Sequence, residues 1–298
     1  MAVPPISRLL HQRNVLLSEV DRLRVELERE QHERHQPASQ PNGITGYSDA
    51  TPAHQNAFDV FPAEWSSAVP GFQTGARADL FGDTRIAWLE RKCGGFTNKR
   101  ILELGPLEAG HTFMMERGGA SHITAIEGNK RAFLKCLVVK NALGLSAQFL
   151  LGDFRQYVRE CTHRYDFVLA SGVLYHMLEP TELLEGLARI SDSLGIWTHY
   201  FDASVIASRP DLTGKFSMTP RVRPFRGRSV SLYEQRYLEA LNWSGFCGGS
   251  APTSAWMTKP DIIGVLTDLG FTAEIGNEEP AHPNGPSMLV FAKRNSVP

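Results

Sequence analysis

Carboxylate side chains stand where short apolar segments end, and such positions suit the binding of hydroxyl and amine groups. Glu103 lies near the end of the apolar stretch 100–104, Glu127 closes the stretch 122–127, and Asp153 follows a third apolar stretch. A glycine-rich turn after one strand, followed about 20 residues later by an acid that ends the next strand, is typical of an adenosine-binding unit. The second acid can accept hydrogen bonds from the ribose hydroxyls, and its charge strengthens them.

The order of these motifs resembles that of class I S-adenosylmethionine-dependent methyltransferases over residues 99–201 and 259–295. The matching residues are Glu103, Gly105 and Gly110 in the first motif, Glu127 in the second, Gly152, Asp153 and Phe154 in the third, and the stretch 165–176 in the fourth. The first motif differs from the usual pattern at Leu107, where a second glycine is common. The run Gly-Val-Leu-Tyr-His at 172–176 is similar to that of tRNA wobble-uridine carboxymethyltransferases.

The resemblance implies S-adenosylmethionine as the cofactor, bound by residues at the ends of the predicted strands. These residues are Glu103, Gly105, Gly110, Glu127, Asp153, Phe154 and Ser171. Glu103 is expected to orient the amino-acid portion of the cofactor, Glu127 to accept from both ribose hydroxyls, and Asp153 to accept from the adenine amino group. We expect no metal, because methyl transfer from a sulfonium mainly requires an aligned and dehydrated nucleophile.

A histidine is the expected proton acceptor. A hydroxyl or amine nucleophile must lose a proton, and an imidazole whose pKa lies near neutrality suits this role. His176 follows the fourth predicted strand, beside the expected position of the transferred methyl group, and is the first candidate. His111 in the first turn, and His199 with Tyr200 after the fifth strand, are the alternatives.

The pattern of apolar runs predicts an α/β fold that would bring these residues together. Strands and helices alternate from residue 100 to residue 201, which favours a mainly parallel sheet with helices on both faces. A helix over 259–269 and two closing strands complete a Rossmann-like, seven-stranded sheet. The insert 202–257 interrupts the alternation with seven basic and four acidic residues and many aromatic side chains, and we expect it to form a lid over the substrate.

The N-terminal part has a different pattern, so we divide the chain into a helix at 1–34, a linker at 35–57 and a methyltransferase domain at 58–298. Leucines seven residues apart within 6–34 predict a short coiled coil, and therefore a homo-oligomer, with a lone amphipathic helix as the alternative. The linker is rich in Pro, Gly, Ser and His. Aromatic residues at 58–72 and a helix predicted over 76–93 precede the first strand.

Composition narrows the choice of compartment and partner. The formal net charge of −1 gives no global attraction to nucleic acid or to an anionic membrane. The four cysteines show no metal-binding spacing, and the sequence has neither a signal-peptide pattern nor an apolar run long enough to span a bilayer. These observations predict a cytoplasmic protein.

Three functions fit the sequence. The first is a methyltransferase that acts, at oxygen, on a small molecule or glycan, since an aromatic and hydroxyl-rich insert suits such an acceptor. The second is a tRNA-modifying methyltransferase or carboxymethyltransferase, supported by the 172–176 run and by an arginine cluster at 221–228 that could grip phosphates. The third is a non-catalytic partner subunit that assembles through its heptad helix.

Overall fold

The computed structural model describes residues 46–76, 78–243 and 245–295. Residues 53–298 form one compact unit, which contains every element given below. The predicted helix at 1–34 and residues 35–45 of the predicted linker at 35–57 lie outside the described residues. The end of that linker is helical instead, because α2 covers His54–Asp59.

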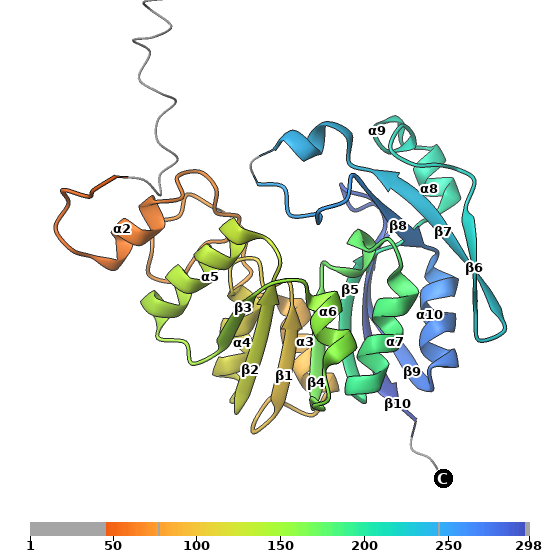
Figure 1. The fold of residues 1–298 in the computed structure, drawn as a ribbon, viewed down its shortest axis with the longest axis horizontal. Helices are drawn as coiled ribbons and strands as arrows, with labels where there is room; N and C mark the ends of the chain where they lie inside the picture. Colours follow the sequence, from red (N-terminus) through yellow and green to blue (C-terminus); the bar gives the residue numbers. More distant parts are fainter. Residues whose placement is uncertain (1–45, 77, 244, 296–298) are drawn as a thin grey trace, which may run out of the picture. The chain divides into compact units, whose positions relative to one another are not determined.

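A seven-stranded sheet forms the centre of this unit, with the strand order β3-β2-β1-β4-β5-β10-β9 (Figure 1). The first five of these strands are parallel, whereas β10 and β9 are antiparallel to their neighbours. The strands are β1 (Arg100–Leu104), β2 (His122–Glu127), β3 (Gln148–Leu151), β4 (Phe167–Ser171), β5 (Ser193–His199), β9 (Phe271–Glu279) and β10 (Ser287–Arg294). The predicted mainly parallel, Rossmann-like sheet is therefore confirmed. The strand order reverses between β1 and β4, where sheets of this kind bind their ligands.

The inner strands β1, β2, β4 and β5 are buried on both faces, which explains why they are nearly continuous apolar runs. Ile101 of β1 packs in one hydrophobic core, while Leu102 packs in the core on the other face. Phe167 and Val168 of β4 divide in the same way. Helices α3, α4 and α5 cover the first face, and α6, α7 and α10 cover the second.

Four of the six helices around the sheet, α3, α5, α6 and α10, begin at a residue whose side chain caps them. The six helices are α3 (Thr84–Lys92), α4 (Gly110–Arg117), α5 (Lys130–Leu143), α6 (Phe154–Glu160), α7 (Pro180–Ile190) and α10 (Lys259–Asp268), with a short 3₁₀ turn η1 at Leu174–His176. The helix predicted over 76–93 starts later, at Thr84, because the Asp83 carboxylate accepts from the backbone N–H of Arg85 and caps α3 there. Across the described residues, no helix has both the length and the apolar character needed to cross a bilayer.

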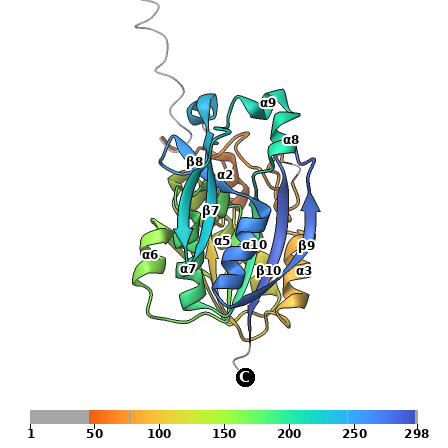
Figure 2. The same ribbon diagram turned by 90° about the vertical axis from the view of Figure 1, so that its right-hand side faces the viewer.

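The insert at 202–257 is more ordered than a loop. It contains α8 (Ala203–Ala207), α9 (Pro210–Thr213), β6 (Arg221–Phe225), β7 (Arg228–Arg236), η2 (Leu238–Asn242) and β8 (Thr253–Met257). Strands β6, β7 and β8 form an antiparallel sheet beside α7 and α10 (Figure 2). Val230 and Leu232 of this sheet are buried in the core that those helices share.

The arginine cluster lies on the hairpin formed by β6 and β7, and acidic residues of the body neutralise it. Arg221 lies 2.8 Å from Glu179, and Arg223 lies 2.8 Å from Glu182. Two more ion pairs, Arg226 with Glu185 and Arg228 with Asp268, extend the row along α7 and α10. These arginines therefore hold the insert against the body rather than present an unpaired basic surface.

Candidate active site

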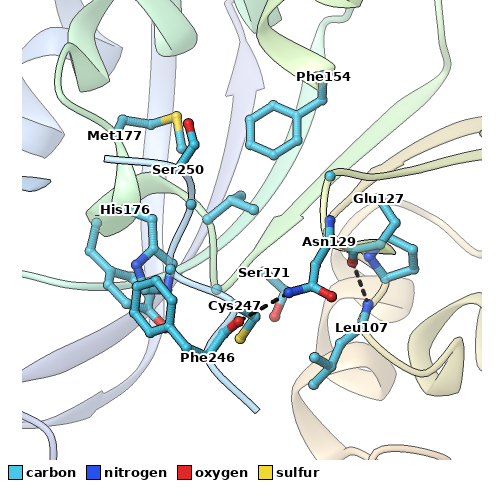
Figure 3. Close-up of a pocket in the computed structure, with 18 of the residues that line it drawn as sticks. Leu107, Glu127, Asn129, Phe154, Ser171, His176, Met177, Phe246, Cys247 and Ser250 are labelled. Carbon is cyan, nitrogen blue, oxygen red and sulfur yellow. Dashed lines mark hydrogen bonds between the residues drawn. The ribbon is translucent and has the colours of Figure 1, made fainter. Parts of the chain in front are cut away.

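A cavity of about 960 Å³ lies at the carboxyl ends of the parallel strands (Figure 3). Its wall contains residues that end or follow β1, β2, β3, β4 and β5, so it occupies the crevice expected at the strand reversal. Of the seven predicted cofactor-binding residues and His176, six line it: Gly105, Glu127, Asp153, Phe154, Ser171 and His176. The alternative bases His111 and His199 line it as well. In Figure 3, Glu127 and Asn129 lie on one side of the cavity, and His176 lies on the other.

Glu127 holds its carboxylate in place through the backbone of two neighbouring turns. Oε2 accepts from the Leu107 N–H at 3.1 Å, and Oε1 accepts from the Asn129 N–H at 2.8 Å. Burial raises the pKa of the Glu127 carboxyl, and these backbone donors oppose that rise. Each oxygen retains a second lone pair for a ligand hydroxyl. Glu127 is thus suited to bind a vicinal diol such as that of a ribose.

The turn between β1 and α4 has the tight conformation that its glycines predicted. Gly105 has φ +66°, and a Cβ there would lie 2.9 Å from Val173, so the close backbone approach needs glycine. Leu107 adopts φ +54° without being glycine, which explains why glycine is common at this position in related turns. Gly110 does not line the cavity: its missing Cβ makes room for Leu80, which would lie 2.7 Å away. Gly110 therefore serves packing.

Glu103 lies behind the turn rather than in the cavity wall. Its side chain is buried and accepts a hydrogen bond from the Thr112 hydroxyl of α4. Burial raises the pKa of the Glu103 carboxyl to about 8, the Thr112 hydroxyl opposes this rise, and the nearby Glu127 adds to it. In this structure Glu103 fixes α4 against β1. This role is less direct than the cofactor contact that we predicted from the sequence.

Asp153 is held by two groups of a single residue, Arg155. It caps α6 by accepting from the Arg155 N–H at 2.8 Å, and it pairs with the Arg155 guanidinium at 2.7 Å. The hydrogen bond from Arg155 holds the pKa of the Asp153 carboxyl below its usual range. Asp153 and Phe154 both border the cavity on the side of Glu127. At this position the Asp153 carboxylate could contact the edge of a planar base, and the Phe154 ring could contact its face.

His176 and His199 line the other half of the cavity. Nδ1 of His176 lies 2.8 Å from the Tyr237 hydroxyl, and Nδ1 of His199 lies 2.8 Å from the Gly285 carbonyl. Burial lowers the pKa of His176 to about 3 and that of His199 to about 4, so both rings are neutral. Tyr200, the other candidate after β5, instead donates to Glu278 and lies outside the cavity wall.

His111 belongs to a charged cluster at the edge of the cavity. Its Nε2 lies 2.9 Å from Asp83, and the Arg85 guanidinium pairs with the same carboxylate at 2.6 Å. Although burial of Asp83 acts to raise its pKa, the hydrogen bonds from His111 and Arg85 outweigh this effect and hold the pKa well below its usual range. The Arg85 guanidinium also lies over the Trp197 ring. Asp83 therefore neutralises Arg85, a cation that lines this side of the cavity.

Comparison with known proteins supports the fold. The N-terminal domain of EvdMO1, crystallised in the presence of SAH and D-fucose, is 21% identical and matches with a TM-score of 0.58, over 81% of this chain and 94% of that one. The chain has the Rossmann-like fold of class I methyltransferases. The full EvdMO1 structure matches with a TM-score of 0.52, and the match covers 46% of its chain.

Comparison of sequences found one relative that matches part of the chain, and no family profile that matches it. Ubiquinone biosynthesis O-methyltransferase of Aeromonas salmonicida (strain A449) is 26% identical over 106 residues. That match covers 36% of this chain and 44% of the relative, so the chain is matched to less than half of that protein's length. No protein-family profile matches the chain.

Several cavity residues of this methyltransferase fold were missed by sequence reasoning. Arg85, Trp197 and His282 line the imidazole half, and the segment 246–251 of the insert closes one wall. Trp197 could have been found, because it lies two residues before His199 on the same strand and therefore on the same face. The others come from segments remote in sequence. We predicted that the insert 202–257 forms a lid over the substrate, but only residues 246–251 of the insert line the cavity.

The two halves of the cavity offer different chemistry. The Glu127 side presents a buried carboxylate, backbone amides and the Phe154 ring, which together can hold a nucleoside. The opposite side presents neutral imidazoles and aromatic rings, which can hold a hydroxylated molecule and accept its proton. Among the described residues, no group of three or more His, Cys, Asp or Glu side chains is arranged to hold a metal ion.

Proposed function

We propose that the protein is an S-adenosylmethionine-dependent methyltransferase that transfers the methyl group to an oxygen of a small molecule or glycan. The observation that carries this proposal is the position of Glu127. Its backbone-anchored carboxylate ends β2 inside a cavity of about 960 Å³ at the strand reversal. The cavity can accommodate a nucleoside beside a second, smaller molecule.

The residues of the cavity fit the cofactor. When bound, S-adenosylmethionine supplies an electrophilic methyl group on a sulfonium sulfur. Glu127 would hold the ribose hydroxyls, and Gly105 would let the backbone come close to the amino-acid portion. Asp153 and Phe154 would border the adenine. These residues would thus position the cofactor. The protein would then also have to align the acceptor and exclude water.

The imidazole half would handle the proton of the acceptor. A bound sulfonium would supply the methyl group and keep the electron pair of its carbon–sulfur bond, so the acceptor oxygen would have to give up its proton to this half of the cavity. The hydroxyl proton passes to Nε2 of a neutral imidazole, for which His176 and His199 are both placed in the wall. Their low pKa values keep this nitrogen unprotonated but also make it a weak base. Alignment would therefore contribute more to the rate than basicity.

Known proteins support the choice of acceptor. D-fucose is present in the crystal of the EvdMO1 domain, and SAH, the demethylated form of the cofactor, is present with it. The partial sequence relative is named as an O-methyltransferase. Both observations favour a hydroxyl acceptor on a small molecule. The RNA alternative loses its main support, because the arginines that suggested phosphate binding are paired with Glu179, Glu182, Glu185 and Asp268.

Calorimetry of the full chain with S-adenosylmethionine and with S-adenosylhomocysteine tests the cofactor. We expect both to bind, and Glu127→Ala to weaken binding by about tenfold to a hundredfold, since hydrogen bonds to a charged group contribute about 1.5–3 kcal/mol. Glu160→Ala, which removes an exposed acid at the end of α6, is the matched control and should change neither affinity. Wild-type protein that binds neither compound would contradict the proposal and favour the non-catalytic partner subunit.

We also propose that the chain works in the cytoplasm and self-associates through residues 6–34. All four cysteines are present as thiols, which suits a reducing compartment. Sedimentation of the full chain and of a variant with proline at Leu16 tests the association, since proline breaks a helix at its centre. The variant should be monomeric if the heptad helix joins the subunits, and an unchanged mass would exclude that role.

A further inference from the structure

The backbone fixes the protonation state of His199 in the acceptor half of the cavity. Nδ1 lies 2.8 Å from the Gly285 carbonyl and 3.2 Å from the Pro286 carbonyl. Carbonyl oxygens only accept hydrogen bonds, so Nδ1 must carry the ring proton. Nε2 then has an unshared electron pair, and it has no hydrogen-bond partner among the described residues. His199 therefore presents a hydrogen-bond acceptor.

His176 reaches the same state through a tyrosine. The Tyr237 hydroxyl donates its single proton to the Gly248 carbonyl at 2.8 Å, and the same oxygen lies 2.8 Å from Nδ1 of His176. Since that proton is used, the hydroxyl oxygen can only accept from His176, and Nδ1 carries the ring proton. The electron pair of His176 again lies on Nε2. Tyr237 is thus a positioning residue for His176.

His282 is fixed in the opposite state. Its Nδ1 accepts from the backbone N–H of Asn284 at 3.2 Å, so its proton lies on Nε2. The ring packs edge-to-face on His199, with centroids 4.9 Å apart, and it lines the same cavity. The wall therefore combines two imidazole acceptors with one imidazole donor.

The two acceptors lie within reach of one small molecule. The Tyr175 ring lies 4.1 Å from the His176 ring and 4.6 Å from the His199 ring, between centroids, so at most about 8.7 Å separates the two imidazole centroids. A single six-membered polyol can span that distance with a hydrogen bond at each end. Tyr175 and Trp197 supply aromatic surface beside them, which suits the C–H faces of such a ring.

We infer that the methyl acceptor is a neutral polyol that offers at least two hydroxyl donors, one to Nε2 of His176 and one to Nε2 of His199. The inference rests on the proposed function and specifies the acceptor of that same site. Burial, which keeps the pKa of both rings low, preserves the acceptor form at neutral pH. An anionic acceptor fits less well, because two electron pairs would face it and the Arg85 guanidinium is already paired with Asp83.

Nitrogen–proton correlation NMR of histidine side chains in the full chain, saturated with S-adenosylhomocysteine, tests the imidazole pattern directly. We expect His176 and His199 to be protonated at Nδ1 only, and His282 at Nε2 only, so that the third ring serves as an internal reference. Tyr237→Phe removes the oxygen that accepts from Nδ1 of His176, so the ring proton of His176 should no longer be confined to Nδ1. The tautomer of His199 should stay unchanged. Protonation of either His176 or His199 at Nε2 in the wild-type protein would overturn the inference.

Two neutral probes of similar size then test the acceptor class. Methyl β-D-xylopyranoside, which has three adjacent hydroxyls, should shift the resonances of both His176 and His199 in a saturable titration, whereas cyclohexanol should bind more weakly. His176→Phe and His199→Phe should each reduce the xyloside affinity about tenfold while affinity for S-adenosylhomocysteine stays unchanged, and His163→Phe, at an exposed position, should alter neither. A xyloside titration that moves neither ring would refute the inference. Loss of cofactor binding alone would instead count against the proposed function.

Discussion

The side-chain amide of Asn129 donates to the carbonyl of Phe246, with 3.0 Å between nitrogen and oxygen (Figure 3). Asn129 follows Glu127 by two residues and caps α5, whereas Phe246 belongs to the insert segment that closes the cavity. A second hydrogen bond, from Tyr237 to Gly248, holds the same segment from the side of His176. The segment 246–251 is thus attached to both halves of the cavity.

Replacing Asn129 by serine should loosen this segment without harming the helix. Serine still caps α5, but it is too short to reach Phe246, so we expect S-adenosylhomocysteine to bind a few-fold more weakly, for a loss of about 1 kcal/mol. Asn129→Ala removes the cap as well and should also lower the unfolding free energy by about 1 kcal/mol. Calorimetry and urea unfolding of both variants separate the two effects. Equal cofactor affinity in the wild type and the serine variant would show that the attachment has no influence on binding.

The buried ion pair between Lys135 and Glu108 should be the most sensitive electrostatic contact in this unit. The Lys135 ammonium lies 2.6 Å from Glu108, and Glu108 also accepts from the backbone N–H groups of Ser66 and Ser67. Lys135→Met leaves a buried carboxylate without its cation, so the unfolding free energy should fall by about 3–5 kcal/mol.

Adding Glu108→Gln to that variant should recover part of the loss, because the neutral amide oxygen still accepts from the same backbone groups. Lys92→Met breaks a surface pair with Glu274 and serves as the control, with an expected change below about 1 kcal/mol. Urea unfolding measures all three variants. A loss as small for Lys135→Met as for the control would mean that the buried Glu108 side chain does not depend on the Lys135 ammonium.

The parts of the fold that sequence could predict are those fixed by neighbouring residues. Apolar runs gave β1 and β2 their bounds, and Asn129 and Gly144 mark the two ends of α5, where one caps and the other adopts a left-handed conformation. The sheet of the insert escaped notice because β6 is largely exposed and carries Arg221 and Arg223, which pair with α7. Val222, between these arginines, is itself exposed, so the alternation along β6 does not mark a buried face.

The site shows the same division between local and remote signals. Glu127 and His176 were predicted because each ends or follows a strand of the motif region. His282 could not be predicted, since it lies in the connection between β9 and β10 and reaches the cavity only because β10 pairs with β5. Tyr237 likewise acts on His176 across 61 residues of sequence. Roles that depend on strand pairing between distant segments require the structure.

Bulk tRNA should not bind through the arginine hairpin. Arg221, Arg223, Arg226 and Arg228 each pair with a carboxylate, so few positive charges remain to release counterions from phosphates. We expect no electrophoretic shift with tRNA at low salt. Glu182→Gln, which releases one arginine partner, should at most introduce weak and salt-sensitive binding. Tight binding by the wild type that Arg223→Ala abolishes would restore the RNA hypothesis.

Glu103 should make stability fall as the pH rises. Burial raises its pKa in the folded protein to about 8 from an ordinary value of 4.5, so the folded state binds the extra proton between these values. The stabilisation is complete below the lower value and is lost as the pH passes the upper one. Glu103→Gln keeps an acceptor for Thr112 without a titrating group. Urea unfolding at about pH 6 and about pH 9 should therefore show a smaller decrease for the variant than for the wild type. Parallel decreases would place the titration elsewhere.

His176 and His199 should act in the opposite direction, on acidification. Burial lowers their pKa values to about 3 and about 4, against an ordinary value of 6.5, so the unfolded state binds more protons between these limits. Their contribution to stability is complete above about pH 6.5 and declines as the pH falls, and His199→Phe should reduce this acid sensitivity. The Cε1–H resonances of both rings should remain constant from about pH 8 to about pH 5, a range in which the histidines of urea-unfolded protein titrate. A midpoint between about pH 5 and about pH 7 for either ring would mean that the imidazole becomes charged near neutrality, in which case it could no longer offer an electron pair to an acceptor hydroxyl.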